Sequence, residues 1–150
     1  MPPPERTHAV LLRNLPLRLL DRARQHSDAL VREFAFVVHG GDDSGVPARL
    51  LEIAADSDAN YANLNPEAER LCDDALARGE EFLDVEVTVP SHFRDHILAA
   101  VPVLLEVEEF CRSGQMLTLV APDDLRAFWV WYLGEFVRQI EGQPPQPWPT

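Results

Sequence analysis

Apolar residues recur every three or four positions in several long stretches of the chain, and this spacing constrains the fold more than any other feature. From residue 20 to residue 37 the pattern is sustained, which predicts an amphipathic helix with one buried face. Pro16 suits the first turn of that helix, and the pair Gly40-Gly41 is a typical stop signal. One long helix is therefore expected in the N-terminal part of the chain.

The same kind of spacing predicts four further helices. One begins at Pro47, and the next covers residues 66–78. A helix over residues 92–112 contains Pro102, which we expect to kink it. The last helix, residues 122–140, has the widest apolar surface. We expect this last helix to lie at the centre of the molecule, because a peripheral helix needs only one apolar stripe.

Residues 82–89 include alternating apolar and polar side chains, which is typical of a short half-buried strand. Because one strand needs a partner, we expect it to pair with the β-prone residues 117–120. The predicted fold class is all-α. It is a single-domain bundle of four or five helices with one short two-stranded element over residues 83–89 and 117–120.

Three parts are expected along the chain. Residues 1–14 form an extended lead-in, because the prolines at positions 2 to 4 disfavour a helix. Residues 15–142 form the helical bundle. Residues 143–150 form a proline-rich tail around Trp148, for which the composition favours polyproline II.

The charge balance limits the partners that the chain can have. Thirteen Arg and no Lys face twenty-five acidic residues, for a net charge of −12, which lacks the electrostatic footprint of a nucleic-acid or anionic-membrane binder. Residues 41–112 hold five Arg and seventeen acids and so account for the whole excess. This distribution favours a partner with a basic face, and the simpler interpretation is a solvated surface that keeps the chain soluble.

The sequence predicts a cytoplasmic protein with no membrane segment. The apolar residues of the first twenty positions are interrupted by Arg13 and Pro16, so they do not resemble a secretory signal. The longest uncharged apolar run, residues 97–105, is nine residues long, against the roughly 20 that span a bilayer. Cys72 and Cys111 lie on apolar helix faces and are expected to be core residues.

Candidate chemistry is sparse, and we expect no cofactor and no catalytic residue. His92 and His96 are four residues apart on one predicted helix, but a catalytic zinc site usually has three protein ligands. His26 could be the third if its helix packed alongside. The alternative function is therefore a helical-bundle metal-dependent enzyme or small-molecule binder. Neither a GxSxG motif nor a glycine-rich phosphate loop is present in the sequence.

The aromatic residues near the C-terminus are more informative. Residues 128–132 hold four aromatic side chains, which cannot all enter one core from one helix. If Trp129 and Tyr132 face the core, Trp131 points away from it. We therefore expect Trp131 to be covered by Trp148 of the tail, by a partner protein or by a small molecule. Charged residues on two helices could form a seam beside it. The candidate partner-binding residues are Trp131, Trp148, Arg138, Glu135, Arg32 and Glu33.

Four stretches carry a family resemblance. They are the helix with His26 and Arg32-Glu33-Phe34, the extended residues 85–90, residues 110–119 (FCRSGQMLTL) and residues 131–139 (WYLGEFVRQ) ahead of Trp148. From about residue 15 onward the chain resembles small helical proteins of actinobacteria. Those proteins accompany, or are fused to, ATP-binding anti-sigma serine kinases, phosphatases and STAS-domain antagonists.

The resemblance implies a non-catalytic regulator in a partner-switching or stress-response circuit. This sequence has neither the phosphate-binding boxes of the kinase nor the strand–helix alternation of a STAS domain, so the chain would be their companion. No catalytic residue carries over from the resemblance. The expected partner is another protein, a signalling kinase or an antagonist, or a second copy of the chain.

Overall fold

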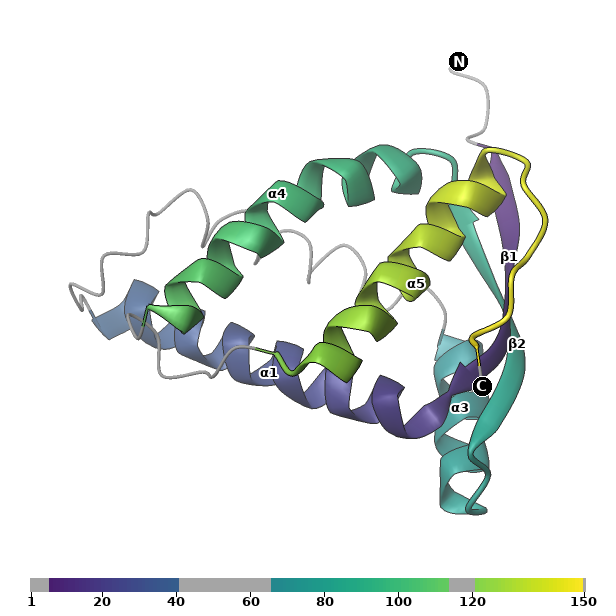
Figure 1. The fold of residues 1–150 in the computed structure, drawn as a ribbon, viewed down its shortest axis with the longest axis horizontal. Helices are drawn as coiled ribbons and strands as arrows, with labels where there is room; N and C mark the ends of the chain where they lie inside the picture. Colours follow the sequence, from purple (N-terminus) through teal and green to yellow (C-terminus); the bar gives the residue numbers. More distant parts are fainter. Residues whose placement is uncertain (1–5, 41–65, 114–120, 150) are drawn as a thin grey trace.

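A computed structural model describes residues 6–40, 66–113 and 121–149 of the chain (Figure 1). Within these ranges the protein has four helices and two strands. The helix predicted from Pro47 and the strand predicted over residues 117–120 lie outside the described residues. In chain order the elements are β1 (Thr7–Pro16), α1 (Leu17–Gly40), α3 (Pro66–Ala77), β2 (Phe82–Pro90), α4 (Phe93–Arg112) and α5 (Asp123–Ile140).

The all-α fold class was wrong, because the helices pack against an antiparallel two-stranded sheet. The partner of β2 is β1, with a register that runs from Thr7 opposite Pro90 to Pro16 opposite Phe82. The predicted boundary at residue 14 therefore falls inside a strand. Alternation is hard to see in β1, because Leu11 adds an apolar side chain on the less buried face and the register shifts after Leu12.

The shift in register is a β-bulge at Arg13 and Asn14. Leu12 lies opposite Val85 and Leu15 opposite Leu83, so β1 has one residue more than β2 between these pairs. Asn14 takes a left-handed backbone conformation with φ of 57°, which asparagine tolerates better than most residues. Its backbone N–H donates to Asp84 Oδ1 at 2.7 Å. The bulge keeps both leucines buried in the core.

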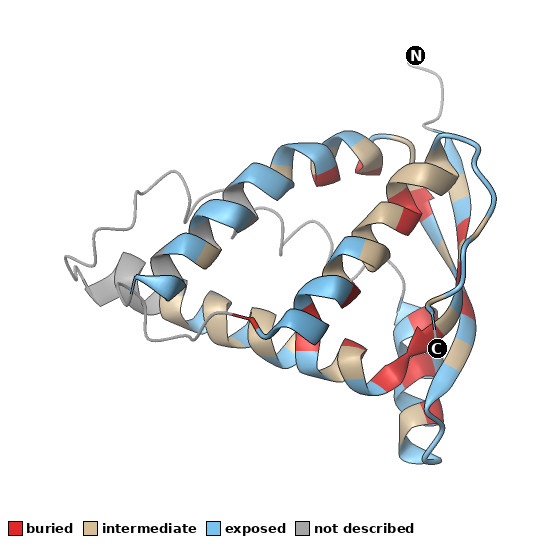
Figure 2. Cartoon of the chain, viewed as in Figure 1, coloured by how far each residue is buried: buried red, intermediate tan, exposed pale blue. Residues whose placement is uncertain are grey.

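The core lies where the sheet meets α3, α5 and the first half of α1, and Figure 2 shows the buried positions gathered at this end of the molecule. Helix α5 packs on β1, α1 and α4, which confirms its predicted central position. Among the described residues, Phe128 of α5 is the largest side chain that is fully buried. Helix α4 contacts α5 but carries long exposed stretches. It bends along its length in Figure 1, as expected for a helix that contains Pro102.

After α5 the chain reverses and runs back along β1 (Figure 1). The helix ends in a Schellman motif, in which the N–H of Gly142 donates to the carbonyl of Gln139 and that of Gln143 to the carbonyl of Arg138. Gly142 has φ of 94°, a conformation that glycine adopts without steric cost. This turn directs the proline-rich tail, residues 143–149, into contact with the strand.

Candidate interaction site

The centre of the candidate site is the aromatic cluster on α5. The ring of the buried Phe128 lies 5.3 Å from that of Tyr132 and 6.2 Å from that of Trp131, measured between centroids. Trp148 of the tail joins the cluster, with its ring edge-on to Trp131 at 5.6 Å. The tail therefore covers part of Trp131, which was the first of the three alternatives. Both tryptophans remain partly exposed.

The tail is held by its backbone as well as by its tryptophan. The N–H of Gln146 donates to Glu135 Oε1 at 2.8 Å, and Trp131 Nε1 donates to the carbonyl of Gln146 at 3.0 Å. The N–H of Trp148 donates to the carbonyl of Arg13 at 3.0 Å, and Asn14 Nδ2 donates to the carbonyl of Trp148 at 2.8 Å. The tail thus joins α5 to the bulge of β1.

Glu135 lies inside the molecule and not at the surface expected for a partner-binding residue. Its side chain is 1% exposed. Besides Gln146, the carboxylate accepts a hydrogen bond from Gln139 Nε2 at 3.2 Å and forms an ion pair with Arg138. The Gln139 amide in turn pairs with the backbone N–H and carbonyl of Leu11 at 2.8 and 2.9 Å. The sequence does not distinguish this buried glutamate from an exposed one, because Arg138 and Gln139 lie within one helical turn, as partners of an exposed glutamate also do, and its burial depends on how the tail and β1 pack.

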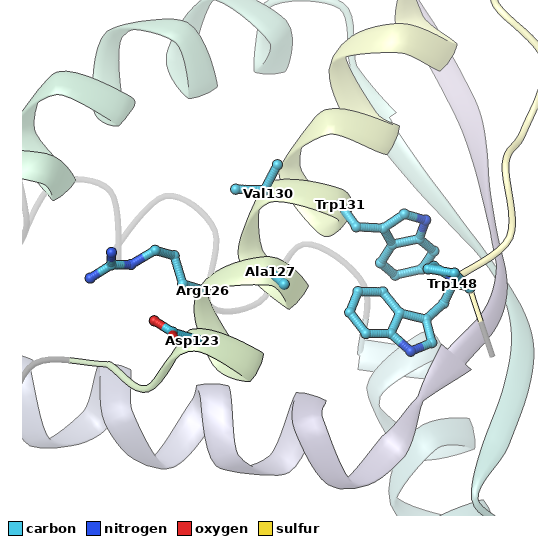
Figure 3. A pocket seen from close by; sticks show the side chains of 7 residues that line it. Asp123, Arg126, Ala127, Val130, Trp131 and Trp148 are labelled. Carbon is cyan, nitrogen blue, oxygen red and sulfur yellow. The ribbon is translucent and has the colours of Figure 1, made fainter.

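An open pocket of about 510 Å³ lies beside the two tryptophans (Figure 3). The rings of Trp131 and Trp148 lie on one flank, and the side chain of Val130 is 73% exposed. The lining surface is almost entirely apolar. The residues that line it are Asp123, Arg126, Ala127, Val130, Trp131, Trp148 and Pro149.

The structure separates the two stretches of the predicted charged seam. Arg32 and Glu33 lie on the second half of α1, which in Figure 1 runs away from the end of α5 that carries Glu135 and Arg138. Arg138 is paired within its own helix instead. Helix spacing predicts contacts between neighbouring turns, but it does not predict which halves of two helices meet.

The three candidate histidines are not brought together either. His92 and His96 are neighbours at the start of α4, with ring centroids 5.1 Å apart. His26 of α1 contacts Glu108, twelve residues and so roughly 18 Å further along α4 than His96. The described part of the chain contains no group of three or more His, Cys, Asp or Glu side chains placed to hold a metal ion.

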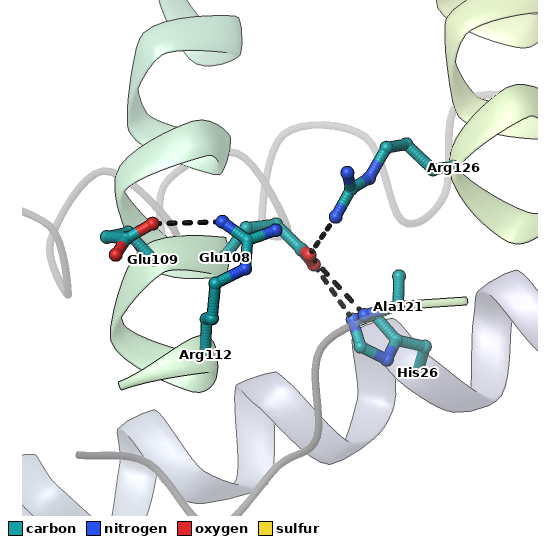
Figure 4. A network of polar contacts seen from close by, with 6 residues as sticks. All are labelled: His26, Glu108, Glu109, Arg112, Ala121 and Arg126. Atoms are coloured by element: carbon teal, nitrogen blue, oxygen red, sulfur yellow. Dashed lines mark hydrogen bonds and ion pairs between the residues drawn. The ribbon is translucent and has the colours of Figure 1, made fainter. Parts of the chain in front are cut away.

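His26 belongs to a different cluster, which sequence reasoning missed (Figure 4). Its Nε2 lies 3.5 Å from one carboxylate oxygen of Glu108, and an Arg126 nitrogen lies 3.5 Å from the other. The cluster links α1, α4 and α5, and Glu108 is only 21% exposed. Arg126 also lines the pocket, so this cluster lies beside it.

Two further titratable groups, Cys72 and Asp124, have shifted pKa values. Cys72 is buried as predicted, and burial raises the pKa of its thiol, which makes it a poor nucleophile at neutral pH. The side chain of Cys111 lies outside the described residues. Asp124, near the pocket, accepts two hydrogen bonds from Arg22, and these lower the pKa of its carboxyl. These arrangements suit packing and charge pairing.

Comparisons with protein families, with curated proteins and with solved structures find no match to this chain. None of the described helices is long and apolar enough to cross a membrane.

Proposed function

We propose that the chain is a non-catalytic regulatory module that binds another protein through the pocket beside Trp131 and Trp148. The observation that carries this proposal is the exposed apolar lining of that pocket, above all Val130 at 73% exposure. An exposed apolar side chain beside two partly exposed tryptophans is the kind of surface that a partner protein can cover. Aromatic residues are enriched at the centres of such interfaces, and tryptophan often supplies much of the binding energy.

Charge indicates the chemistry of the partner. The chain carries a net charge of −12, and the exposed Asp123 lies at the pocket. Arg126, the basic residue of the lining, is directed to Glu108. The partner then presents an apolar side chain from a basic surface, because opposite charges speed the encounter and fix its orientation.

The resemblance supplies the class of partner. It supports a companion of an anti-sigma serine kinase or of a STAS-domain antagonist, acting in a stress-response circuit in the cytoplasm of an actinobacterium. In that role the chain works by occupying or releasing a partner. It needs no cofactor and no catalytic residue.

The test compares two variants that each place a charge at an exposed apolar helix position. Val130→Glu alters the pocket, and Leu105→Glu alters α4, where Leu105 is 66% exposed and outside the pocket. Untagged wild-type protein and both variants are isolated from the native cells and analysed by native mass spectrometry. We expect a heterocomplex with the wild type and with Leu105→Glu, and its loss with Val130→Glu.

Val130 is the better choice than Trp131 for this test, because Trp131 also holds the tail. Circular dichroism of both variants checks that the helices are intact. A lone chain from all three proteins would refute the interaction function. A heterocomplex that survives Val130→Glu would refute the pocket as its contact surface.

A further inference from the structure

The tail has few backbone donors, and the body of the protein accepts hydrogen bonds from all of those in residues 144–149. Four of these six residues are prolines, which carry no N–H. The two that remain are Gln146 and Trp148, and their N–H groups donate to Glu135 and to Arg13. Their carbonyls accept from Trp131 and Asn14. The tail is therefore bound as an extended peptide is bound in a groove.

In the groove between β1 and α5, the groups that bind the tail are also oriented by contacts with each other. Glu135, 1% exposed in its side chain, is oriented by Gln139 and Arg138. Gln139 is itself fixed to both backbone groups of Leu11. On the other side the bulge places the Asn14 amide and the Arg13 carbonyl next to each other. Preorganised donors and acceptors of this kind lower the entropic cost of binding a segment.

The contacts also indicate which residues of a bound segment are recognised by their side chains and which by their backbone alone. Gln146 is exposed and is recognised through its backbone, so its side chain is free to vary. Trp148 is read by its ring, which lies edge-on to Phe128 at 6.1 Å and to Trp131 at 5.6 Å. Proline on either side favours the extended conformation before binding. The pattern that fits is any residue, then Pro-Trp-Pro.

We propose that this groove is a recognition site for a Pro-Trp-Pro segment of the partner protein, and that the chain's own tail occupies the site until the partner replaces it. The inference rests on the proposed function, since it names the segment by which the partner binds. The bound tail shows the chemistry of the occupant. The groove is continuous with the pocket of the proposed function, because Trp148 and Pro149 of the bound tail form part of the pocket wall.

To displace the tail, the partner needs contacts beyond those of its Pro-Trp-Pro segment. The tail follows α5 after a single turn, so its effective concentration at the groove is on the order of millimolar. A free peptide of the same sequence competes poorly against it. A partner that also contacts Val130 gains the additional affinity, so the apolar pocket and the groove act together.

The experiment uses the full chain and a labelled peptide with the sequence of residues 143–150, QPPQPWPT. Fluorescence anisotropy follows peptide binding to the wild type and to Trp148→Ala, which removes the aromatic anchor of the tail. We expect saturable binding to Trp148→Ala, and binding about tenfold weaker to the wild type because the tail competes. The peptide with Trp replaced by Ala should bind neither protein.

A second variant, Gln146→Pro, keeps Trp148 but removes the N–H that Glu135 accepts. We expect it to bind the peptide more tightly than the wild type. The proposal is overturned if folded Trp148→Ala does not bind the peptide, or if it binds the Trp and Ala peptides equally. It is also overturned if the wild type is a dimer that Trp148→Ala dissociates, because the occupant would then be a second copy.

The two proposals fail in different ways. Val130 makes none of the four backbone hydrogen bonds to the tail, so Val130→Glu in the Trp148→Ala background should still bind the peptide. Peptide binding together with a heterocomplex that resists Val130→Glu would refute the pocket alone. Loss of the heterocomplex in Val130→Glu without any peptide binding would refute the groove alone.

Discussion

Glu135 shows how one buried charge organises its surroundings. Its carboxylate accepts from a backbone N–H of the tail and from the Gln139 amide, and it pairs with Arg138. A buried charge is tolerated when it has such partners, and removing one member of the set leaves the others desolvated and unpaired. The residue therefore couples the end of α5, β1 and the tail.

Replacing this carboxylate should destabilise the protein. Glu135→Ala leaves the N–H of Gln146 without its acceptor and opens a small cavity, so we expect the free energy of unfolding to fall by about 3 kcal/mol. Urea denaturation followed by circular dichroism measures it. Glu86→Ala, at an exposed strand position, is the matched control and should change stability by less than about 0.5 kcal/mol. Equal losses in the two variants would contradict a special role for Glu135.

Tyr132 gives stability a dependence on alkaline pH. Burial raises the pKa of its hydroxyl to about 12, above the value near 10 of an unfolded chain. The folded state therefore favours the neutral phenol. This stabilisation is complete below about pH 10 and is lost as the pH rises through 12. The loss stays below the roughly 2.7 kcal/mol of a fully buried group, because the side chain of Tyr132 is partly exposed.

Tyr132→Phe removes the titrating group, so its free energy of unfolding should fall less steeply between pH 10 and 12 than that of the wild type. Chemical denaturation at intervals of half a pH unit measures both slopes. Parallel curves for the two proteins would show that the hydroxyl does not titrate with folding.

Two glycines of the same region should respond to alanine in opposite ways. Gly134 lies inside α5 with open space where a Cβ would be, so Gly134→Ala should raise the free energy of unfolding by about 0.5–1 kcal/mol. Gly142 also has open space, but its φ of 94° disfavours any side chain. Gly142→Ala should lower stability by about 1 kcal/mol. Thermal denaturation of the pair checks the sign, and a gain at both sites would argue against the left-handed turn.

The elements that sequence reasoning predicted are those with local signals. The spacing of apolar residues predicted α1, α3, α4 and α5, and the alternation around Val85 and Val87 predicted β2. The strand β1 was missed, and with it the fold class. Its pairing with β2 joins residues more than 65 positions apart in the chain, and the bulge at Asn14 breaks the alternation that would have revealed it.

The candidate site was predicted in part for the same reason. Trp131 stands out because a helix cannot bury aromatic residues all round, and the tail next to it contains Trp148. The groove could not be predicted, since its two sides come from β1 and α5, which are far apart in the chain. Nothing in the local sequence indicates that Gln139 pairs with Leu11, or that Asn14 holds Trp148.

For the molecule as a whole, the excess of acidic residues sets the response to salt. Repulsion among the acids destabilises the compact state, and salt screens it. We expect the Tm to rise by a few degrees between about 10 and 200 mM NaCl. A double variant, Glu67→Gln with Asp74→Asn, removes two exposed acids, so its Tm should rise less with added salt than that of the wild type. A Tm that falls with salt would mean that exposed pairs such as Arg22 with Asp124 outweigh the repulsion.

The alternation of prolines in the tail has a consequence for hydrogen exchange. Between positions 144 and 149 the chain carries only two amide hydrogens, those of Gln146 and Trp148, and each is donated to a different element of the body. Hydrogen exchange resolved to single amides separates these two protons from those of the neighbouring Gln143 and Thr150. One proton reports the contact with α5 and the other the contact with β1, so the order in which they acquire deuterium reveals from which end the tail comes away.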